Sequence, residues 1–108
     1  MKYTVEFTDA ASRDLKDITR YIKKNSGSGI AKQVLSSLSS RIDSLRDLPE
    51  RGNIPKEMLE IGPHSFRELH YKPYRIFYST RENTVTVLLI ADGWRDMQTL
   101  LRQRLLND

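Results

Sequence analysis

The chain has 108 residues, and its 18 lysines and arginines outnumber its 14 aspartates and glutamates, which gives a formal net charge of +4. This length predicts a single domain over residues 1–108, because two separate hydrophobic cores would need a longer chain. Cysteine is absent, which excludes disulfides and thiolate metal sites. A protein that only gripped nucleic acid would carry a larger basic excess, so charge alone selects no partner.

The first residues alternate between apolar and polar types, with Tyr3, Val5 and Phe7 on one side. This period of two predicts a strand and not the continuous apolar segment of a secretory signal. No apolar run reaches the length of a membrane span. We therefore expect a cytoplasmic protein with no membrane contact.

Two helices are predicted next. Thr8 or Asp9 can cap the first helix, which should end in the glycine-containing segment 25–29. A second apolar stripe at helical spacing covers residues 31–48 and is followed by a proline. Two helices joined by so short a loop form an antiparallel hairpin. The next segment, residues 49–65, holds too many prolines and glycines for a long regular element.

The first helix carries a basic face opposite its apolar stripe. This face consists of Arg13, Lys16, Arg20 and Lys23. The simplest interpretation is a solvated helix surface. The functional alternative is docking on an acidic surface or on nucleic acid.

From residue 66 onward the period falls to two. The segments 66–71, 74–80 and 84–91 are rich in aromatic and β-branched residues, and their short connections predict an antiparallel meander. Asp92 or Gly93 should open a last helix. We expect the apolar residues of that helix to face the core, namely Met97, Leu100, Leu101 and Leu105. The predicted order of N-terminal strand, helical hairpin, three-stranded meander and C-terminal helix defines an α+β domain.

Basic and aromatic residues gather on the predicted meander. Alternation places Arg75 and Phe77 on the strand face away from the helical hairpin, and Arg67 shares that face if the register allows it. Arg95 could join them, and guanidiniums beside aromatic rings would suit phosphate contact. Alternatively, each arginine is solvated or pairs with a nearby carboxylate, namely Glu68, Glu82 or Asp96.

His64 and His70 are the only imidazoles in the sequence. Together with Glu68 they offer three metal ligands, but their spacing matches no metal signature. We predict neither a metal nor a cofactor. A general acid or base role for His70 is a better alternative, because histidine suits proton transfer near neutral pH, although a surface histidine is the simpler interpretation.

Three motifs are specific: Arg67-Glu68-Leu69, Tyr74-Arg75-Ile76-Phe77-Tyr78 and Ile90-Ala91-Asp92-Gly93-Trp94-Arg95. These motifs resemble those of the RelE/ParE superfamily of bacterial type II toxins, and the resemblance covers almost the whole chain. The resemblance implies one of two activities on one fold. RelE-like members are ribosome-dependent mRNA endoribonucleases, whereas ParE-like members inhibit DNA gyrase. Members of both kinds are neutralised by a cognate antitoxin.

Carried over position by position, the nuclease arginines would be Arg75 and Arg95, but the C-terminal proton-transfer residue has no match. Residues 97–108 contain neither tyrosine nor histidine. His70 or Tyr71 could substitute from the neighbouring strand, which keeps a ribosome and mRNA as alternative partners. We predict a ParE-like gyrase inhibitor with no catalytic residue. Its predicted target-binding surface consists of Arg67, Arg75, Trp94 and Arg95, and a homodimer and a heterotetramer with the antitoxin both stay open.

Overall fold

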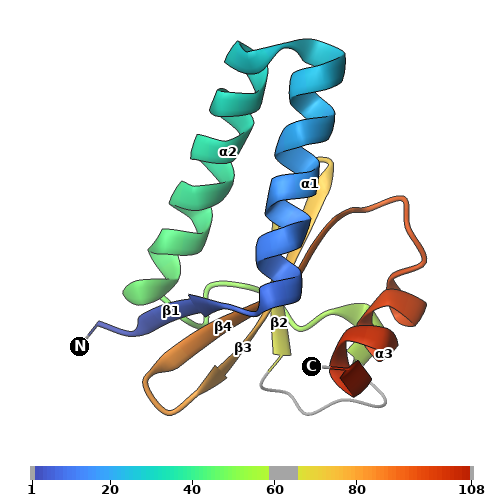
Figure 1. The fold of residues 1–108 in the computed structure, drawn as a ribbon. Helices are drawn as coiled ribbons and strands as arrows, with labels where there is room; N and C mark the ends of the chain where they lie inside the picture. Colours follow the sequence, from blue (N-terminus) through green and yellow to red (C-terminus); the bar gives the residue numbers. More distant parts are fainter. Residues whose placement is uncertain (1, 59–65, 108) are drawn as a thin grey trace.

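The computed structural model describes residues 2–58 and 66–107. Its helices and strands are β1 (Thr4–Phe7), α1 (Asp9–Ser26), α2 (Ser28–Asp43), β2 (Phe66–Tyr71), β3 (Tyr74–Arg81), β4 (Thr84–Asp92) and α3 (Met97–Asn107), with 3-10 turns at Ser44–Arg46 and Lys56–Met58. This order confirms the predicted strand, helical hairpin, meander and C-terminal helix (Figure 1). None of the helices in this described part of the chain combines the length and apolar character that a membrane crossing needs.

The strands form one sheet in the order β1-β4-β3-β2. The pairs β2–β3 and β3–β4 are antiparallel, as expected for a meander, and β1 pairs with β4 in parallel. The N-terminal strand therefore lies beside the last strand of the sheet, with Val5 opposite Val85. The register between β3 and β4 skips Leu88, because Tyr78 lies opposite Val87 and Phe77 opposite Leu89.

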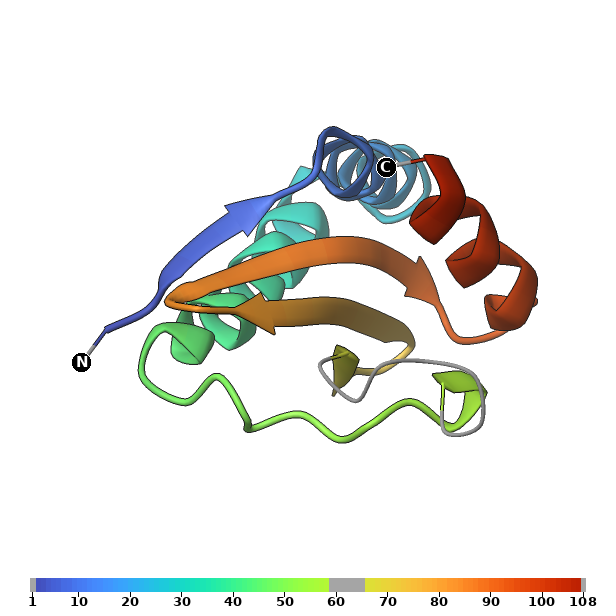
Figure 2. The same cartoon turned by 90° about the horizontal axis from the view of Figure 1, so that it is seen from below.

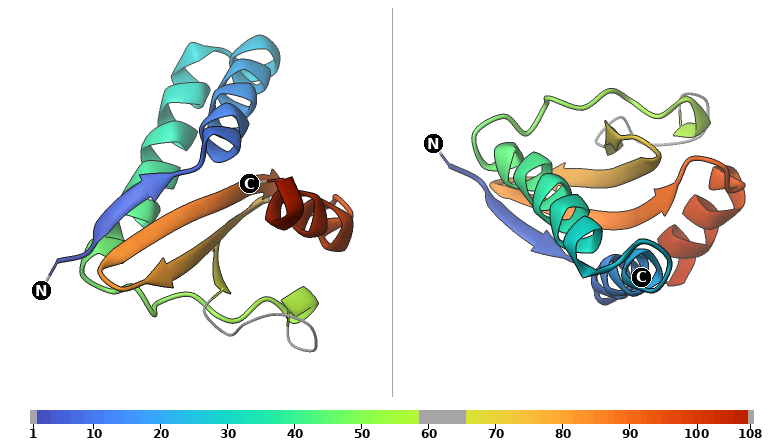
Figure 3. Two further views of the ribbon diagram at one scale, coloured as in Figure 1. Left: turned by 60° about the horizontal axis from the view of Figure 1, so that its bottom comes forward. Right: turned by 90° about the horizontal axis from the view of Figure 1, so that it is seen from above.

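The sheet buries a hydrophobic cluster on each of its faces. The helical hairpin covers one face, where Leu38 and Ile42 of α2 join Leu69, Ile76 and Tyr78. The opposite cluster consists of Met58, Phe77, Leu89, Ala91, Met97 and Leu101, so α3 and the second 3-10 turn cover that face. The segment 47–58 runs along the β2 edge of the sheet, where Asn53 pairs with Glu68 (Figure 2, Figure 3).

Of the two residues predicted to cap α1, Thr8 is the cap and Asp9 is the first residue of the helix. The Thr8 hydroxyl accepts a hydrogen bond from the Ala11 N–H at 3.0 Å. Gly27, with a φ of 93°, separates the two helices. The prediction that the second helix extends to Leu48 was wrong, because the chain tightens into a 3-10 turn after Asp43. Leu45 in that turn is buried, so the apolar spacing of the helix continues beyond its end. Leu48 is 59% exposed.

The last helix also begins later than predicted. Asp92 does not open it but ends β4, where it lies opposite Tyr74. The cap is formed by Asp96 instead, whose carboxylate accepts the Thr99 N–H at 3.2 Å. Met97 and Leu101 face the core as predicted, whereas Leu105 is 40% exposed. The core-facing stripe of α3 is therefore shorter than its sequence suggests.

An ion pair ties α1, β4 and α3 together beyond the end of β1. Asp14 on α1 accepts a hydrogen bond from the Ile90 N–H at 3.0 Å and pairs with both terminal nitrogens of Arg104, at 2.6 and 2.7 Å. Arg104 also donates to the Leu88 carbonyl at 2.9 Å. The edge of β4 that β1 does not cover is thus satisfied by side chains, which fixes α3 against the sheet.

Candidate functional site

The strand register separates the two arginines that were expected to act together. Arg75 lies opposite His70, whereas Arg67 lies opposite Tyr78. Because directly opposed residues share a face, Arg75 shares its face with Glu68 and His70, while Arg67 points to the side of the helical hairpin. The sequence leaves open whether Arg67 and Arg75 share a face, and the register places them on opposite faces. A shift of one residue in register reverses such an outcome, so alternation alone could not decide it.

Arg67 holds the loop that follows α2. Its guanidinium donates to the Gly52 carbonyl at 2.7 Å, and the Gly52 N–H donates to the Tyr78 hydroxyl at 3.0 Å. The same hydroxyl donates to the Pro49 carbonyl at 2.8 Å. Burial raises the pKa of Tyr78, so the phenol keeps the proton that it donates. Arg67 thus takes part in anchoring the loop to the sheet.

Arg75 is enclosed by two carboxylates. Its terminal nitrogens meet both oxygens of Glu57, at 3.0 and 2.9 Å, and its Nε meets Glu68 at 2.7 Å. The side chains of Arg75 and Glu57 are each 13% exposed and that of Glu68 is 4% exposed. The guanidinium also lies over the Phe77 ring, 4.8 Å from its centroid. The arginine is therefore held by bidentate pairing on one edge, a carboxylate on another and an aromatic ring at its face.

The electrostatics of this cluster oppose anion binding. The hydrogen bonds from Arg75 lower the pKa of Glu57, and pairing with Glu57 first and Glu68 second raises the pKa of Arg75 despite its burial. Two carboxylates around one guanidinium leave a net negative charge, so a phosphate would have to displace Glu57 to reach Arg75. The alternative in which Arg75 pairs with Glu68 is confirmed, while Glu57 was not foreseen because no sequence pattern links positions so far apart.

His70 and Tyr71 lie on opposite faces of β2. His70 is on the face of Arg75, with a 53% exposed side chain whose Nε2 lies 3.5 Å from Glu68 Oε1. Tyr71 packs against the core under the helical hairpin, and the Arg41 guanidinium lies 5.3 Å above its ring. Within residues 2–58 and 66–107, no three histidine, aspartate or glutamate side chains are grouped as metal ligands. His64 falls outside this range.

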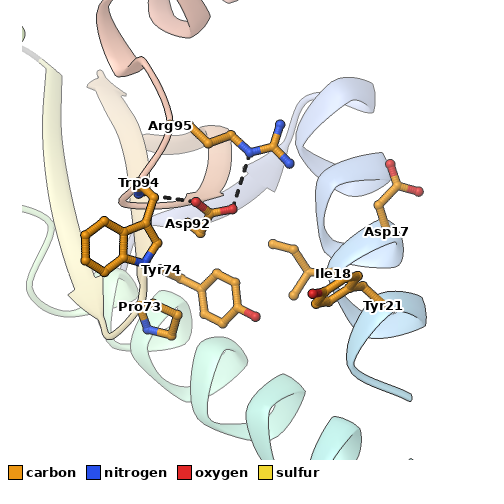
Figure 4. A pocket seen from close by; sticks show the side chains of 8 residues that line it. All are labelled: Asp17, Ile18, Tyr21, Pro73, Tyr74, Asp92, Trp94 and Arg95. Atoms are coloured by element: carbon orange, nitrogen blue, oxygen red, sulfur yellow. Dashed lines mark hydrogen bonds and ion pairs between the residues drawn. The ribbon is translucent and has the colours of Figure 1, made fainter. Parts of the chain in front are cut away.

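A hollow of about 620 Å³ opens between α1 and the end of the meander (Figure 4). We call it the Trp94 pocket. It is lined by Asp17, Ile18, Tyr21, Pro73, Tyr74, Asp92, Trp94 and Arg95. Trp94 and Tyr21 are 89% and 68% exposed, which is unusual for rings of this size. Arg95 is also largely exposed, so the pocket presents aromatic surface and a guanidinium together.

Asp92 organises the rim of the Trp94 pocket. One carboxylate oxygen accepts the Trp94 N–H at 3.2 Å, and the other meets Arg95 Nε at 3.3 Å, so a single side chain orders the turn between β4 and α3 (Figure 4). Burial, and secondarily the Asp92 charge, raises the pKa of Tyr74. Sequence reasoning found Trp94 and Arg95 but assigned Asp92 to a helix start. It also missed Tyr21 and Tyr74, whose meeting depends on how α1 crosses the sheet.

The basic face of α1 is exposed along its length. It comprises Arg13, Lys16, Arg20 and Lys23. Arg20 pairs with Asp17 at 3.2 Å, and both side chains are at least 70% exposed. An exposed pair of this kind is weak, so the geometry fits the simpler interpretation of a solvated face.

Solved structures of toxins and of toxin–antitoxin systems share this fold. The chromosomal ParDE toxin–antitoxin system of P. aeruginosa matches with a TM-score of 0.69 and 16% identity over 84% of this chain and 96% of that one. The RelBE2 toxin–antitoxin complex of Mycobacterium tuberculosis matches with a TM-score of 0.61 and 20% identity, over 88% and 95%. A free mutant form of the E. coli toxin RelE matches with a TM-score of 0.61 and 16% identity, over 95% and 98%.

The sequence itself decides the family. The family model described as the ParE toxin of the type II toxin–antitoxin system, parDE, matches residues 5–97. No curated protein sequence matches significantly. The chain therefore belongs to the ParE toxin family of type II toxin–antitoxin systems.

Proposed function

We propose that this toxin inhibits DNA gyrase by binding it, without a catalytic residue of its own, and that a cognate antitoxin neutralises it. The observation that carries the proposal is the enclosure of Arg75 by Glu57 and Glu68. A nuclease of this fold would need that arginine to stabilise a phosphate. Here the guanidinium already has three charged hydrogen bonds within a cluster of net negative charge.

The C-terminal helix supports the same proposal. Residues 97–108 contain no tyrosine or histidine, and Leu100 and Leu101 occupy the positions where the proton-transfer group is expected. Leu101 is 5% exposed and packs into the core. General acid or base catalysis contributes typically about 10²–10⁴-fold in rate, and α3 has no side chain to supply it.

The Trp94 pocket is the proposed gyrase-binding surface. Tryptophan and arginine are the residues most enriched among energetically dominant interface contacts, and Trp94 and Arg95 are adjacent and exposed. Asp92 fixes their turn, so little conformational freedom would be lost on binding. In this proposal Arg67 and Arg75 do not meet the target directly, because Arg67 is bonded to Gly52 and Arg75 is enclosed by Glu57 and Glu68.

A ribosome-dependent endoribonuclease is the second candidate. One observation favours it: the exposed His70 imidazole lies beside Glu68 on the same strand face as Arg75. A histidine held by a carboxylate is a recurrent general base. The two candidates differ in their target, so one pair of assays separates them.

The test measures gyrase supercoiling with ATP and mRNA cleavage on translating ribosomes with the same purified toxin. The variant is Trp94→Ala with Arg95→Ala, and the matched control is Leu106→Ala with Arg102→Ala, an exposed leucine and arginine outside the pocket. We expect inhibition of supercoiling by the wild type and the control but not by the pocket variant, with intact mRNA throughout. Cleavage that disappears in His70→Ala would instead establish the endoribonuclease.

The proposed antitoxin partner is supported by the family and by the solved relatives, two of which are toxin–antitoxin assemblies. Small antitoxin segments of this kind are expected to fold on contact. A mass measurement of the free toxin in solution will show whether it is a homodimer. The same measurement with the antitoxin will show whether the complex is a heterotetramer.

A further inference from the structure

A second hollow, of about 380 Å³, lies where the C-terminal half of α2 meets the strand β2. It is lined by Ser36, Ser37, Ser40, Arg41, Arg51 and Tyr71. Two arginines, three serines and one tyrosine thus surround one space to which no carboxylate contributes. We call this hollow the serine–arginine site, and neither the Trp94 pocket nor the Arg75 cluster shares a residue with it.

The two arginines of this site differ from most other arginines of the molecule in their partners. Carboxylates pair with Arg20, Arg46, Arg75, Arg95 and Arg104. In the described part of the chain, no carboxylate lies within 4.0 Å of Arg41 or Arg51. Asp47 and Glu50 line a neighbouring hollow together with Arg51 but form no ion pair with it. Both guanidiniums therefore keep their positive charge uncompensated by a direct partner.

Neutral groups hold these arginines in place. The Arg41 guanidinium lies over the ring of Tyr71, which itself packs against the core. Stacking engages the face of a guanidinium and leaves the N–H groups in its plane for another acceptor. Arg51 donates to the Ser44 hydroxyl at 2.7 Å, and that hydroxyl donates to the Arg41 carbonyl at 2.6 Å. These contacts position the Arg41 and Arg51 guanidiniums in the absence of a ligand.

From this arrangement we infer that the serine–arginine site binds the phosphodiester backbone of a nucleic acid. Phosphate oxygens accept hydrogen bonds from arginine and from serine alike, and such contacts dominate protein–DNA interfaces. A carboxylate has only two oxygens, which one guanidinium fork can satisfy, whereas this site offers two forks and three serine hydroxyls. Residues 28–42 also contain no aspartate or glutamate, and Asp43, the acidic residue that ends α2, is paired with Arg46 at 2.7 Å.

The inference goes beyond gyrase inhibition and does not depend on it. Two phosphate contacts predict a small but measurable salt dependence, because each contact releases about 0.9 counterion from duplex DNA. Removing both arginines should therefore reduce the slope of log K against log salt by about 1.8. The slope separates local contacts from general attraction by the net charge.

The experiment measures binding of a short fluorescent DNA duplex, and of an RNA of the same sequence, at several salt concentrations. The variant is Arg41→Gln with Arg51→Gln, and the control is Arg13→Gln with Lys16→Gln, which removes the same charge from the basic face of α1. Circular dichroism verifies folding, and the exposed Arg51→Gln alone replaces the double variant if that does not fold. We expect the site variant to bind DNA, RNA or both more weakly and with a smaller slope of log K against log salt. In the control, the change in affinity and the change in slope should each be at most about a third of those in the site variant.

Three results would overturn the inference. An equal loss in the control would mean that the whole basic surface attracts nucleic acid. A lower melting temperature with unchanged binding would mean that the two arginines only stabilise the C-terminus of α2. Unchanged nucleic-acid binding together with weaker antitoxin binding would mean that the site receives a protein carboxylate.

Discussion

Replacing Arg75 with methionine should be among the most damaging single changes on the sheet. The substitution keeps an apolar stem against Phe77 but removes the charge between Glu57 and Glu68. Glu68 is the critical partner, because only 4% of its side chain is exposed and water cannot solvate the carboxylate that remains. Its other contacts, from Asn53 at 3.3 Å and His70 at 3.5 Å, are long.

The magnitude follows from burial. Breaking a buried ion pair by removing one partner costs about 3–5 kcal/mol. Glu57 and Arg75 keep 13% of their side chains exposed, so we expect the lower end, about 3 kcal/mol at neutral pH. An exposed pair such as Arg20–Asp17 is worth less than about 1 kcal/mol, which makes Arg20→Met the matched control.

Urea unfolding followed by circular dichroism measures both variants. If Arg75→Met costs no more than Arg20→Met, the enclosure of Arg75 contributes little and the reasoning is wrong. The double variant Arg75→Met with Glu68→Gln, which removes the stranded buried charge, should be more stable than Arg75→Met alone. A double variant that is less stable would show that Glu68 finds other compensation.

The same cluster sets a dependence of stability on pH. Pairing with Arg75 lowers the pKa of Glu57 below its usual value of 4.5 in the folded protein. The stabilisation is therefore complete above about pH 4.5 and is lost as the pH falls through the folded value. Arg75→Met lacks this term, so the gap in unfolding free energy between wild type and variant should narrow in acid. A gap that stays constant from pH 7 to about pH 3 would contradict the assignment.

Further changes test other parts of the structure. Thr8→Ala should cost about 1 kcal/mol of unfolding free energy by removing the cap of α1, and Thr8→Ser should restore most of it. Gly52→Ala should cost about 1–3 kcal/mol, since a Cβ there would lie 2.7 Å from the Tyr78 hydroxyl and still closer to the main chain of β2. Gly29→Ala, with open space around its helical position, should instead stabilise by up to about 1 kcal/mol in the same urea experiment. An antitoxin at 100 times its Kd should stabilise the toxin by about 2.7 kcal/mol, and an unchanged melting temperature would contradict that partnership.

The fold could be predicted because each element carries its own period. The apolar spacing of Ala11, Leu15 and Ile18 is helical, and the alternation in β3 is that of a strand. Connections of two residues then leave the meander as the only arrangement of β2, β3 and β4. The parallel pairing of β1 with β4 has no such local signal, because it joins segments separated by the whole helical hairpin.

The candidate site was less accessible to sequence reasoning. The arginines on the strands could be named, but their faces depend on a register that pairs Arg75 with His70 and Arg67 with Tyr78. The carboxylate that closes on Arg75 comes from Glu57, which follows an irregular segment and has no sequence periodicity to place it. Trp94 could be named as part of the predicted target-binding surface, but its exposure depends on β4 continuing to Asp92 before the chain turns.

The proposed target is tested by measuring the binding of immobilised toxin to purified gyrase and to purified ribosomes, side by side for the wild type and Trp94→Ala. The account predicts saturable binding to gyrase that Trp94→Ala weakens at least about 30-fold, corresponding to a dominant interface contact of about 2 kcal/mol. It predicts no comparable binding to ribosomes. Binding to ribosomes alone, unchanged in Trp94→Ala, would contradict both the proposed target and the proposed surface.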